Sequence, residues 1–270
     1  VTASCDEGVL SPHGPVGLAE RVILMDATVI MLAVIVPIII LVLAFAWWFR
    51  AGNKKAQYLP DWEYSGRIEM IVWAIPALII MFLGGIAWIG SHDLDPPNAI
   101  ASAGDDVEVQ VVSLDWKWLF IYPKEGVASV NHLVVPVGKP VHFQLTSATV
   151  MNSFFVPQLG SQMYTMPGMT TRLVLQADQA GSYKGISAQY SGEGFSDMHF
   201  DVVAEPEGQY RSWLQQTKAA GNMLDKTAYD ALAHPSSAVP PTTYRSVSAG
   251  LFETVSGGST MAAHMHQGNQ

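Results

Sequence analysis

The sequence predicts a membrane protein that begins with a two-helix transmembrane hairpin, continues as an extracytoplasmic all-β Greek-key sandwich, and ends in a short helical and irregular extension. Two observations support this prediction. Two long stretches near the N-terminus are apolar and uncharged. After them, about a hundred residues alternate between apolar and polar, with turn residues between the runs. Composition agrees, because only 14% of the residues are charged, against about a quarter in soluble domains.

The two apolar stretches are residues 27–49 and 70–91, which are 23 and 22 residues long and carry no Asp, Glu, Lys or Arg. About 20 such residues cross a hydrocarbon core of ~30 Å, so each stretch can span a membrane. Pro37 and Pro76 lie inside them, which transmembrane helices tolerate. Tryptophans lie near the ends, at the membrane interface: Trp47, Trp48 and Trp88. Two buried helices of a soluble protein are the alternative, but both stretches exceed the usual length of such helices.

Loop charge predicts the orientation. The segment between the spans holds four basic residues: Arg50, Lys54, Lys55 and Arg67. Before the first span the only basic residue is Arg21, and after the second none occurs until Lys117. Short loops rich in Lys and Arg stay in the cytoplasm. We therefore expect both termini and the globular domain outside the cytoplasm.

The rest of the chain divides by pattern. We expect an outer N-terminal segment, a helical hairpin, a β-sandwich and a C-terminal extension, with these bounds: residues 1–24, 25–98, 99–204 and 205–270. Seven strands are predicted in the sandwich, at residues 107–114, 132–135, 140–146, 153–156, 171–176, 182–187 and 198–204. The extension should contain helices at residues 209–222 and 225–233, followed by an aromatic-bearing stretch at 244–252.

Charge and cysteine content exclude several classes of function. A net charge of −9 argues against nucleic acid as a partner, because phosphate binding needs a basic face. Cys5 is the only cysteine, so this chain cannot form an internal disulfide or supply two thiolates. Cys5 follows Ala3 and Ser4 as in a bacterial lipoprotein signal, although Thr2 departs from the usual aliphatic residue. Cys5 is therefore either a lipid-attachment site or an ordinary free cysteine.

Several local strings resemble subunit II of the haem-copper oxidases, whose outer domain has a cupredoxin fold. EMIVWAIP at residues 69–76 resembles that family's second-helix signature, and DWKWLFIY at 115–122 its tryptophan-rich strand. NSFFVPQLG at 152–160, followed by Met-Pro-Gly at 166–168, resembles the loop that holds the first copper ligand. SAQYSGEGFSDM at 187–198 matches the copper loop in length. Because these motifs occur in one order over most of the chain, we expect the family's fold.

The donors that copper needs are nevertheless replaced. Copper-binding members of the family have an upstream histidine and a loop with two cysteines, a histidine and a methionine. The corresponding ligand positions in this chain are Asn152, Ser187, Ser191, Phe195 and Met198. A binuclear copper site requires thiolate and imidazole donors, and a serine hydroxyl stays protonated where a thiolate would form. Gln189 stands where the family has an acidic ligand to a second metal. We therefore expect no metal and no cofactor in this chain.

The resemblance then implies the quinol-oxidising branch, the cytochrome bo-type ubiquinol oxidases. In these complexes quinol gives its electrons directly to haem in subunit I, so the haems and copper are expected there and cytochrome c is not a partner. Residues 225–252 resemble the aromatic-rich tail of quinol oxidase subunits. The expected partners are subunit I, other oxidase subunits, membrane lipid and, through the complex, ubiquinol. The expected location is the bacterial inner membrane, with the domain in the periplasm.

Glu69 is the main functional candidate, because it lies at the cytoplasmic end of the second span, where the family has a glutamate near a proton channel. An interfacial glutamate that meets water or lipid is the alternative. Trp116 and Trp118 are expected to pack within the sandwich or against subunit I, since an electron-accepting role has no acceptor beside it. Methionines near the ligand positions could hold Cu(I), but we expect them to fill space: Met151, Met163, Met166, Met169 and Met198.

Two other functions remain as alternatives. A copper-bearing subunit that accepts electrons from cytochrome c is contradicted by the missing cysteines and histidines. A free-standing envelope protein for copper handling would use Met and His side chains, but His132, His142 and His199 show no ligand spacing. Co-purification with a haem-bearing partner distinguishes the oxidase subunit from this second alternative.

Overall fold

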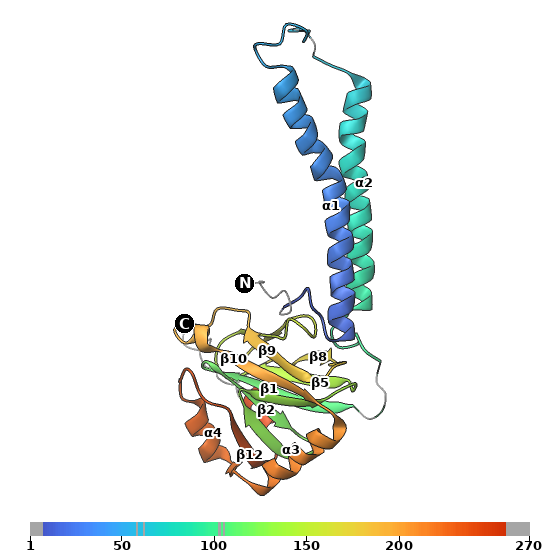
Figure 1. Ribbon diagram of the computed structural model, residues 1–270. Coiled ribbons are helices and arrows are strands. Elements are labelled where there is room, and N and C mark those ends of the chain that lie inside the picture. Colours follow the sequence, from blue (N-terminus) through green and yellow to red (C-terminus); the bar gives the residue numbers. More distant parts are fainter. Residues whose placement is uncertain (1–7, 58, 62, 102–103, 105, 258–270) are drawn as a thin grey trace. The chain divides into compact units, whose positions relative to one another are not determined.

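The computed structural model describes residues 8–57, 59–61, 63–101, 104 and 106–257 (Figure 1). These residues form two compact units. One comprises residues 21–93 and the other comprises residues up to 20 together with those from 94 onward. The first unit is a pair of long helices, and the second contains the sheets and the C-terminal extension. Cys5, the predicted lipid-attachment site, lies outside the described residues.

The hairpin consists of α1 (Pro15–Trp48) and α2 (Gly66–Asp93). Both helices are long and apolar enough to cross a membrane, and no side chain in the most apolar 18 residues of either helix is buried within the protein. Pro37 and Pro76 lie inside them as predicted. The two helices approach each other closely where the first third of α1 meets the C-terminal end of α2. A Cβ atom on Gly90 of α2 would come within 2.6 Å of Ile23 Cδ1 on α1. Glycine therefore permits close approach of the helices there.

Helix α1 begins twelve residues before the apolar stretch that predicted it. Its first turn packs on the β domain: Val16 is buried, and the Gly17 N–H donates to Leu159 O at 3.1 Å. A Cβ on Gly14 would lie 2.2 Å from the backbone oxygen of Gln176, so only glycine fits. The predicted outer segment 1–24 therefore contains a helix start, which the apolar pattern does not reveal.

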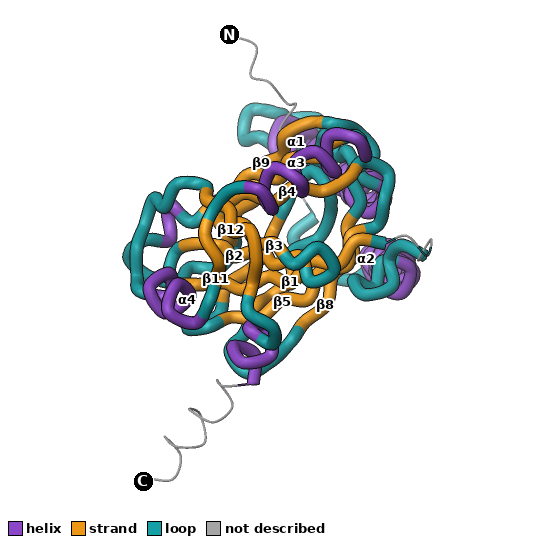
Figure 2. The backbone as a smooth tube through the Cα atoms, turned by 90° about the horizontal axis from the view of Figure 1, so that it is seen from below, coloured by secondary structure: helices purple, strands orange, loops and turns teal. Residues whose placement is uncertain are grey.

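The β domain is a sandwich of two sheets, which confirms the predicted fold class. One sheet has the order β11-β12-β3-β2-β1-β5-β8 and the other β4-β10-β9-β6-β7. The strands are orange in Figure 2. The strands are β1 (Val107–Leu114), β2 (Lys117–Tyr122), β3 (Val127–Val130), β4 (His132–Pro136), β5 (Val141–Ser147), β6 (Asn152–Phe155), β7 (Met163–Thr165), β8 (Thr171–Leu175), β9 (Gly181–Ser187), β10 (His199–Glu205), β11 (Asn222–Leu224) and β12 (Thr242–Val247).

An aromatic cluster fills the space between the sheets. Trp118 and Phe120 come from β2, Phe154 from β6 and Phe200 from β10, and all four are at most 1% exposed. The rings of Phe154 and Phe200 stack with centroids 5.1 Å apart, and Trp118 meets Phe154 edge to face at 5.6 Å. Such pairs add about 0.5–1.5 kcal/mol each beyond their burial. The cluster is the core that holds the two sheets together.

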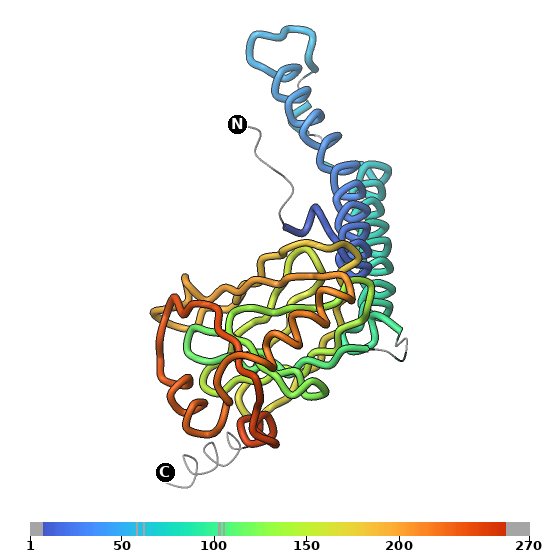
Figure 3. The backbone as a smooth tube through the Cα atoms, turned by 60° about the horizontal axis from the view of Figure 1, so that its bottom comes forward, coloured from blue at the N-terminus to red at the C-terminus, as the bar shows by residue number. Residues whose placement is uncertain are grey.

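The C-terminal extension, drawn in orange to red in Figure 3, contains α3 (Glu207–Ala219), β11, α4 (Lys226–Ala233) and β12. Residues of α4 and of the chain after β12 pack on the opposite face of the larger sheet, whereas Trp213 and Leu214 of α3 pack against the core between the sheets. Helix α4 begins at the predicted place, where the Asp225 carboxylate accepts from Ala228 N at 2.8 Å as an N-cap. Leu224, Leu251 and Phe252 form a second core with residues of the first strands. Strand β2 is consequently buried on both faces.

Candidate functional site

The residues that the family resemblance assigns to copper-ligand positions, called the ligand positions below, lie at one end of the smaller sheet. Asn152 begins β6, and Ser187 ends the neighbouring strand β9. Ser191 lies in the loop between β9 and β10, Phe195 begins a short 3-10 helix (Phe195–Asp197), and Met198 directly precedes β10. The fold therefore brings together residues that are far apart in sequence, as a metal-binding domain of this shape requires.

Hydrogen bonds join the ligand positions in two pairs. Ser187 Oγ donates to Asn152 Oδ1 at 3.2 Å, and thus links the positions of the first cysteine and the upstream histidine. Ser191 Oγ donates to Met198 Sδ at 3.8 Å, and thus links the positions of the second cysteine and the methionine. Side chains at positions where a metal would be bound are therefore joined to one another by hydrogen bonds between neutral groups.

The first pair belongs to a larger buried polar network. Asn152 Nδ2 donates to Val150 O at 3.2 Å and to Ser113 Oγ at 3.4 Å. Ser113 Oγ lies 2.9 Å from Thr165 Oγ1. Ser113, Asn152, Thr165 and Ser187 are all at most 5% exposed. Because Ser113 is on β1 of the larger sheet and the others are on the smaller sheet, the network ties the two sheets together.

The sequence prediction missed Ser113 and Thr165. Ser113 was visible as one polar residue in the otherwise apolar end of a strand, and every residue from Val111 to Leu114 is buried. A buried hydroxyl needs a partner, so the position signalled an internal hydrogen bond. The identity of the partner could not be inferred, because Thr165 is 52 residues away in sequence.

Phe195 and Gln189 stand at two further positions where the family resemblance expects metal ligands. The ring of Phe195 meets that of Tyr190 edge to face, with centroids 5.6 Å apart. Gln189 contributes its backbone oxygen, which accepts from Ser187 Oγ at 3.3 Å. An aromatic ring at the histidine position and a neutral amide at the acidic position remove both charge and imidazole from the loop.

The donor set does not fit a binuclear copper centre. It offers hydroxyl and amide oxygens and one thioether, where two thiolates and two imidazoles are needed. Across the part of the chain that the structure describes, no group of three or more His, Cys, Asp and Glu is placed to hold a metal. Among the methionines, Met198 lies in the aromatic core, whereas Met151 and Met169 are 40% and 54% exposed.

Trp116 and Trp118 have different surroundings. Trp118 packs between Phe154 and Phe200, and its Nε1 has no partner among the described residues. Trp116 is half-buried and has a φ of 64°, the left-handed region that bulky residues rarely adopt. Its Nε1 donates to Ser191 O at 3.1 Å. Trp116 thus contacts the loop that carries one ligand position.

Glu69 lies in the first turn of α2, and its side chain is exposed. Its carboxylate has no hydrogen bond or ion pair with the residues that the structure describes. Between Glu69 and Gly90 there are 21 helical steps, or roughly 32 Å at ~1.5 Å per residue. The helix from Glu69 to Gly90 is therefore long enough to cross a hydrocarbon core of ~30 Å.

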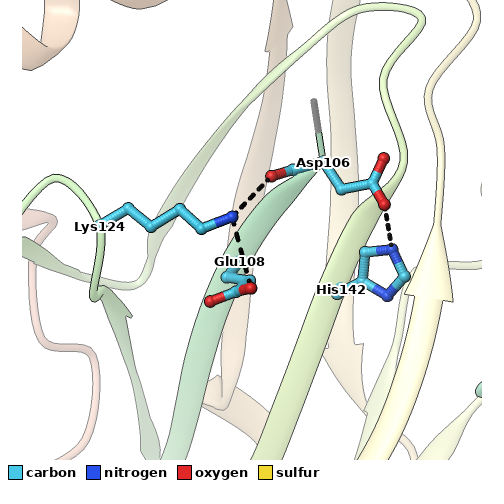
Figure 4. A network of polar contacts seen from close by, with 4 residues as sticks. All are labelled: Asp106, Glu108, Lys124 and His142. Atoms are coloured by element: carbon cyan, nitrogen blue, oxygen red, sulfur yellow. Dashed lines mark hydrogen bonds and ion pairs between the residues drawn. The ribbon is translucent and has the colours of Figure 1, made fainter. Parts of the chain in front are cut away.

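The three histidines lie in different places: His199 directly follows Met198 and has an exposed side chain at the start of β10, whereas His132 and His142 lie on other strands. His142 Nε2 lies 2.9 Å from Asp106 Oδ2, and the neighbouring Lys124 contacts Asp106 O and Glu108 (Figure 4). His132 is half-buried, and burial lowers its pKa. These are contacts of the sheet surface.

Comparisons with known proteins agree with this geometry. Residues 109–205 match the family described as "Cytochrome C oxidase subunit II, periplasmic domain", and residues 218–256 match the "COX Aromatic Rich Motif". The chain is 48% identical over 265 residues to cytochrome bo(3) ubiquinol oxidase subunit 2 of Pseudomonas aeruginosa, covering 98% of this chain and 78% of the relative. It is 44% identical over 255 residues to ubiquinol oxidase subunit 2 of Acetobacter aceti, covering 94% and 83%.

A more distant relative, quinol oxidase subunit 2 of Bacillus cereus, is 34% identical over 234 residues, covering 86% of this chain and 80% of the relative. The similarity thus extends through both helices, the sandwich and the extension. The chain belongs to the ubiquinol oxidase subunit 2 family.

Proposed function

We propose that this chain is the non-redox second subunit of a proton-translocating oxidase that couples ubiquinol oxidation to oxygen reduction in subunit I. The observation that supports this most strongly is the pairing of the ligand positions, Ser187 with Asn152 and Ser191 with Met198. A domain with these side chains has no group that accepts and releases an electron at this site. Electrons from quinol then pass directly to the haem of subunit I, and this chain supports the assembly of the complex.

The test is a metal count and a donor comparison on the intact complex. Oxygen uptake is measured with ubiquinol and, separately, with reduced cytochrome c as the donor. We expect turnover with quinol alone, and a copper content that haem-bearing subunit I accounts for. Turnover with cytochrome c, or a near-infrared band of a mixed-valence copper pair in the isolated chain, would overturn the proposal.

The proposed location is the bacterial inner membrane, with the loop between α1 and α2 in the cytoplasm and the β domain in the periplasm. The loop charges support it, because four basic residues lie between the spans: Arg50, Lys54, Lys55 and Arg67. Protease added to spheroplasts should cleave the β domain and spare this loop. If Cys5 is lipidated, the mass of the N-terminal peptide rises by the mass of the acyl groups.

Glu69 is the proposed proton-entry residue. Its support is an exposed carboxylate in the first turn of an apolar helix, without a hydrogen bond or ion pair to the residues that the structure describes. Glu69→Gln should slow oxygen reduction or proton uptake while the complex still assembles, because the amide cannot exchange protons. Glu63→Gln is the matched control, since Glu63 is also exposed and lies in the loop before α2. Equal turnover in both variants would remove the role from Glu69.

A further inference from the structure

The turn between β1 and β2 is unusually constrained. Leu114 and Lys117 pair directly, so only Asp115 and Trp116 connect the strands. Trp116 has a φ of 64°, a conformation that is uncommon for a bulky residue and is held only where surrounding contacts determine it. Each of the residues from 115 to 117 makes such contacts, and their side chains contact three different parts of the chain.

Trp116 contacts the β9–β10 loop. Its Nε1 donates to Ser191 O at 3.1 Å. A Cβ atom on Gly194 would lie 2.4 Å from the Trp116 ring, and one on Gly192 would lie 3.4 Å away. The ring therefore lies directly against the glycine backbone of this loop. Two of the ligand positions, Ser191 and Phe195, belong to the same loop.

Lys117 contacts the C-terminal extension. It is only 1% exposed, and its Nζ donates to Ser236 Oγ at 2.6 Å and to His234 O at 2.8 Å. The third donor reaches Asp115 O at 3.2 Å. All three ammonium protons are thus used. Burial lowers the pKa of Lys117, and the Asp115 carboxylate partly opposes this.

Asp115 contacts the β5–β6 loop. Thr149 Oγ1 donates to Asp115 Oδ1 at 2.6 Å. The backbone oxygen of Asp115 also accepts from Ser236 N at 3.4 Å. The side chain of Asp115 therefore holds the loop that leads to Asn152, and its backbone holds the extension.

We propose that the turn at residues 115–117 couples three segments, namely residues 148–151, 191–195 and 234–236, into one cooperative unit, with Lys117 as the positioning residue. Without the Lys117 bonds, the extension is released and the turn loses one of the anchors that hold Trp116 at positive φ. Relaxation of Trp116 then withdraws its ring from Gly194 and frees the β9–β10 loop. The coupling concerns contacts within this chain and does not depend on the proposed electron donor.

Hydrogen–deuterium exchange of the intact oxidase complex tests this coupling. Lys117→Met keeps the length of the side chain and removes its donors. We expect exchange to accelerate about tenfold or more in residues 234–236 and also in 191–195, because opening one part of a cooperative unit opens the rest. Lys218→Met is the control, since Lys218 is exposed on α3, and it should leave both segments unchanged.

Ser236→Ala is the second variant, and it decides the question if Lys117→Met fails to assemble. It removes one acceptor of Lys117 and retains the His234 and Asp115 bonds, so we expect a smaller acceleration in the same two segments. A purely local role for Lys117 would accelerate exchange only at residues 234–236. Acceleration confined to that segment, or no acceleration in either, overturns the proposed coupling.

Discussion

Asn152→Ala is the substitution that best tests whether hydrogen bonds have replaced metal bonds at the ligand positions. Asn152 is 1% exposed and makes three side-chain hydrogen bonds. Its Nδ2 donates to Val150 O and Ser113 Oγ, and its Oδ1 accepts from Ser187 Oγ. Substitution by alanine removes all three hydrogen bonds. Water cannot replace them, because the side chain is buried.

The expected loss of stability follows from these contacts. A typical buried hydrogen bond contributes about 0.5–1.5 kcal/mol, and a buried group left without a partner costs about 1–3 kcal/mol. Ser187 keeps Gln189 O as an acceptor at 3.3 Å, and Ser113 keeps Thr165 at 2.9 Å, so neither hydroxyl is orphaned. Val150 O still accepts from Ser147 Oγ. We therefore expect a destabilisation of about 2–3 kcal/mol, at the lower end of what three lost bonds could give.

Urea unfolding of the full chain in detergent micelles measures this loss, with near-UV circular dichroism of the β-domain tryptophans as the signal. A shift of the midpoint at constant slope reports a change in stability. Asn222→Ala, at an exposed position of β11, is the control and should shift the midpoint little. Combining Asn152→Ala with Ser187→Ala should show a coupling of about 0.5–1.5 kcal/mol.

Additive effects of the two substitutions would refute the reasoning, because residues that do not interact add independently. A loss below about 0.5 kcal/mol for Asn152→Ala would refute it too, since surface substitutions alone reach that size.

Two further predictions concern the core and the sheet edge. Gly185→Ala should lower the free energy of unfolding by about 1–3 kcal/mol through overpacking, because the added Cβ would lie 2.1 Å from the Phe200 ring. The double variant with Phe200→Leu should recover part of this loss in the same urea assay. Burial lowers the pKa of His132, and Asp201 and Glu205 oppose this. The unfolded chain therefore binds a proton at His132 before the folded chain does as the pH falls. The free energy of unfolding should be unaffected by His132 above about pH 6.5 and should decrease below it, by at most about 1.4 kcal/mol per pH unit. His132→Asn should make the urea midpoint less dependent on pH between pH 5 and 7.

The sequence predicted those elements whose signal is local. The seven predicted strands correspond to β1, β4, β5, β6, β8, β9 and β10, each within two residues at either end. All of them bury one face more than the other or are bounded by turn residues, so alternation and turns suffice to find them. The strand at residues 117–122 was indicated only by the family resemblance, because it is buried on both faces and shows no alternation.

Elements that depend on distant partners were missed. Strands β3, β7, β11 and β12 were not predicted. Strands β7 and β11 have only three residues each, which is too few for a pattern of their own, and β3 is buried throughout and shows no alternation. Strand β12 forms because it pairs with β3, which is more than a hundred residues earlier in the sequence. The start of α1 was missed for a similar reason, since Glu20, Arg21 and Asp26 interrupt the apolar run and contacts with the β domain stabilise the first turn.

The same limit applies to the site. The absence of thiolate and imidazole donors is visible in single residues of a recognised motif, so the sequence alone is enough to predict that copper is not bound, and this stays a prediction. The hydrogen bonds at these positions could not be predicted in this way, because each of them joins residues from separate motifs. The partner of Ser187 is 35 residues away, and Lys117 reaches Ser236 across 119 residues. Neither pair has a spacing rule, so only the folded structure reveals them.

Retention of the loop geometry without copper demands many weak contacts, because a metal site can contribute on the order of 10 kcal/mol to folding and a neutral hydrogen bond about 1 kcal/mol. The network around Asn152 supplies several such bonds between the two sheets. The turn at residues 115–117 adds others that hold the neighbouring loops and the extension. None of these side chains changes its redox state under physiological conditions. These contacts therefore let the end of the domain keep its shape without copper donors, which accounts for a fold of the cytochrome c oxidase subunit II type in a chain of the ubiquinol oxidase subunit 2 family.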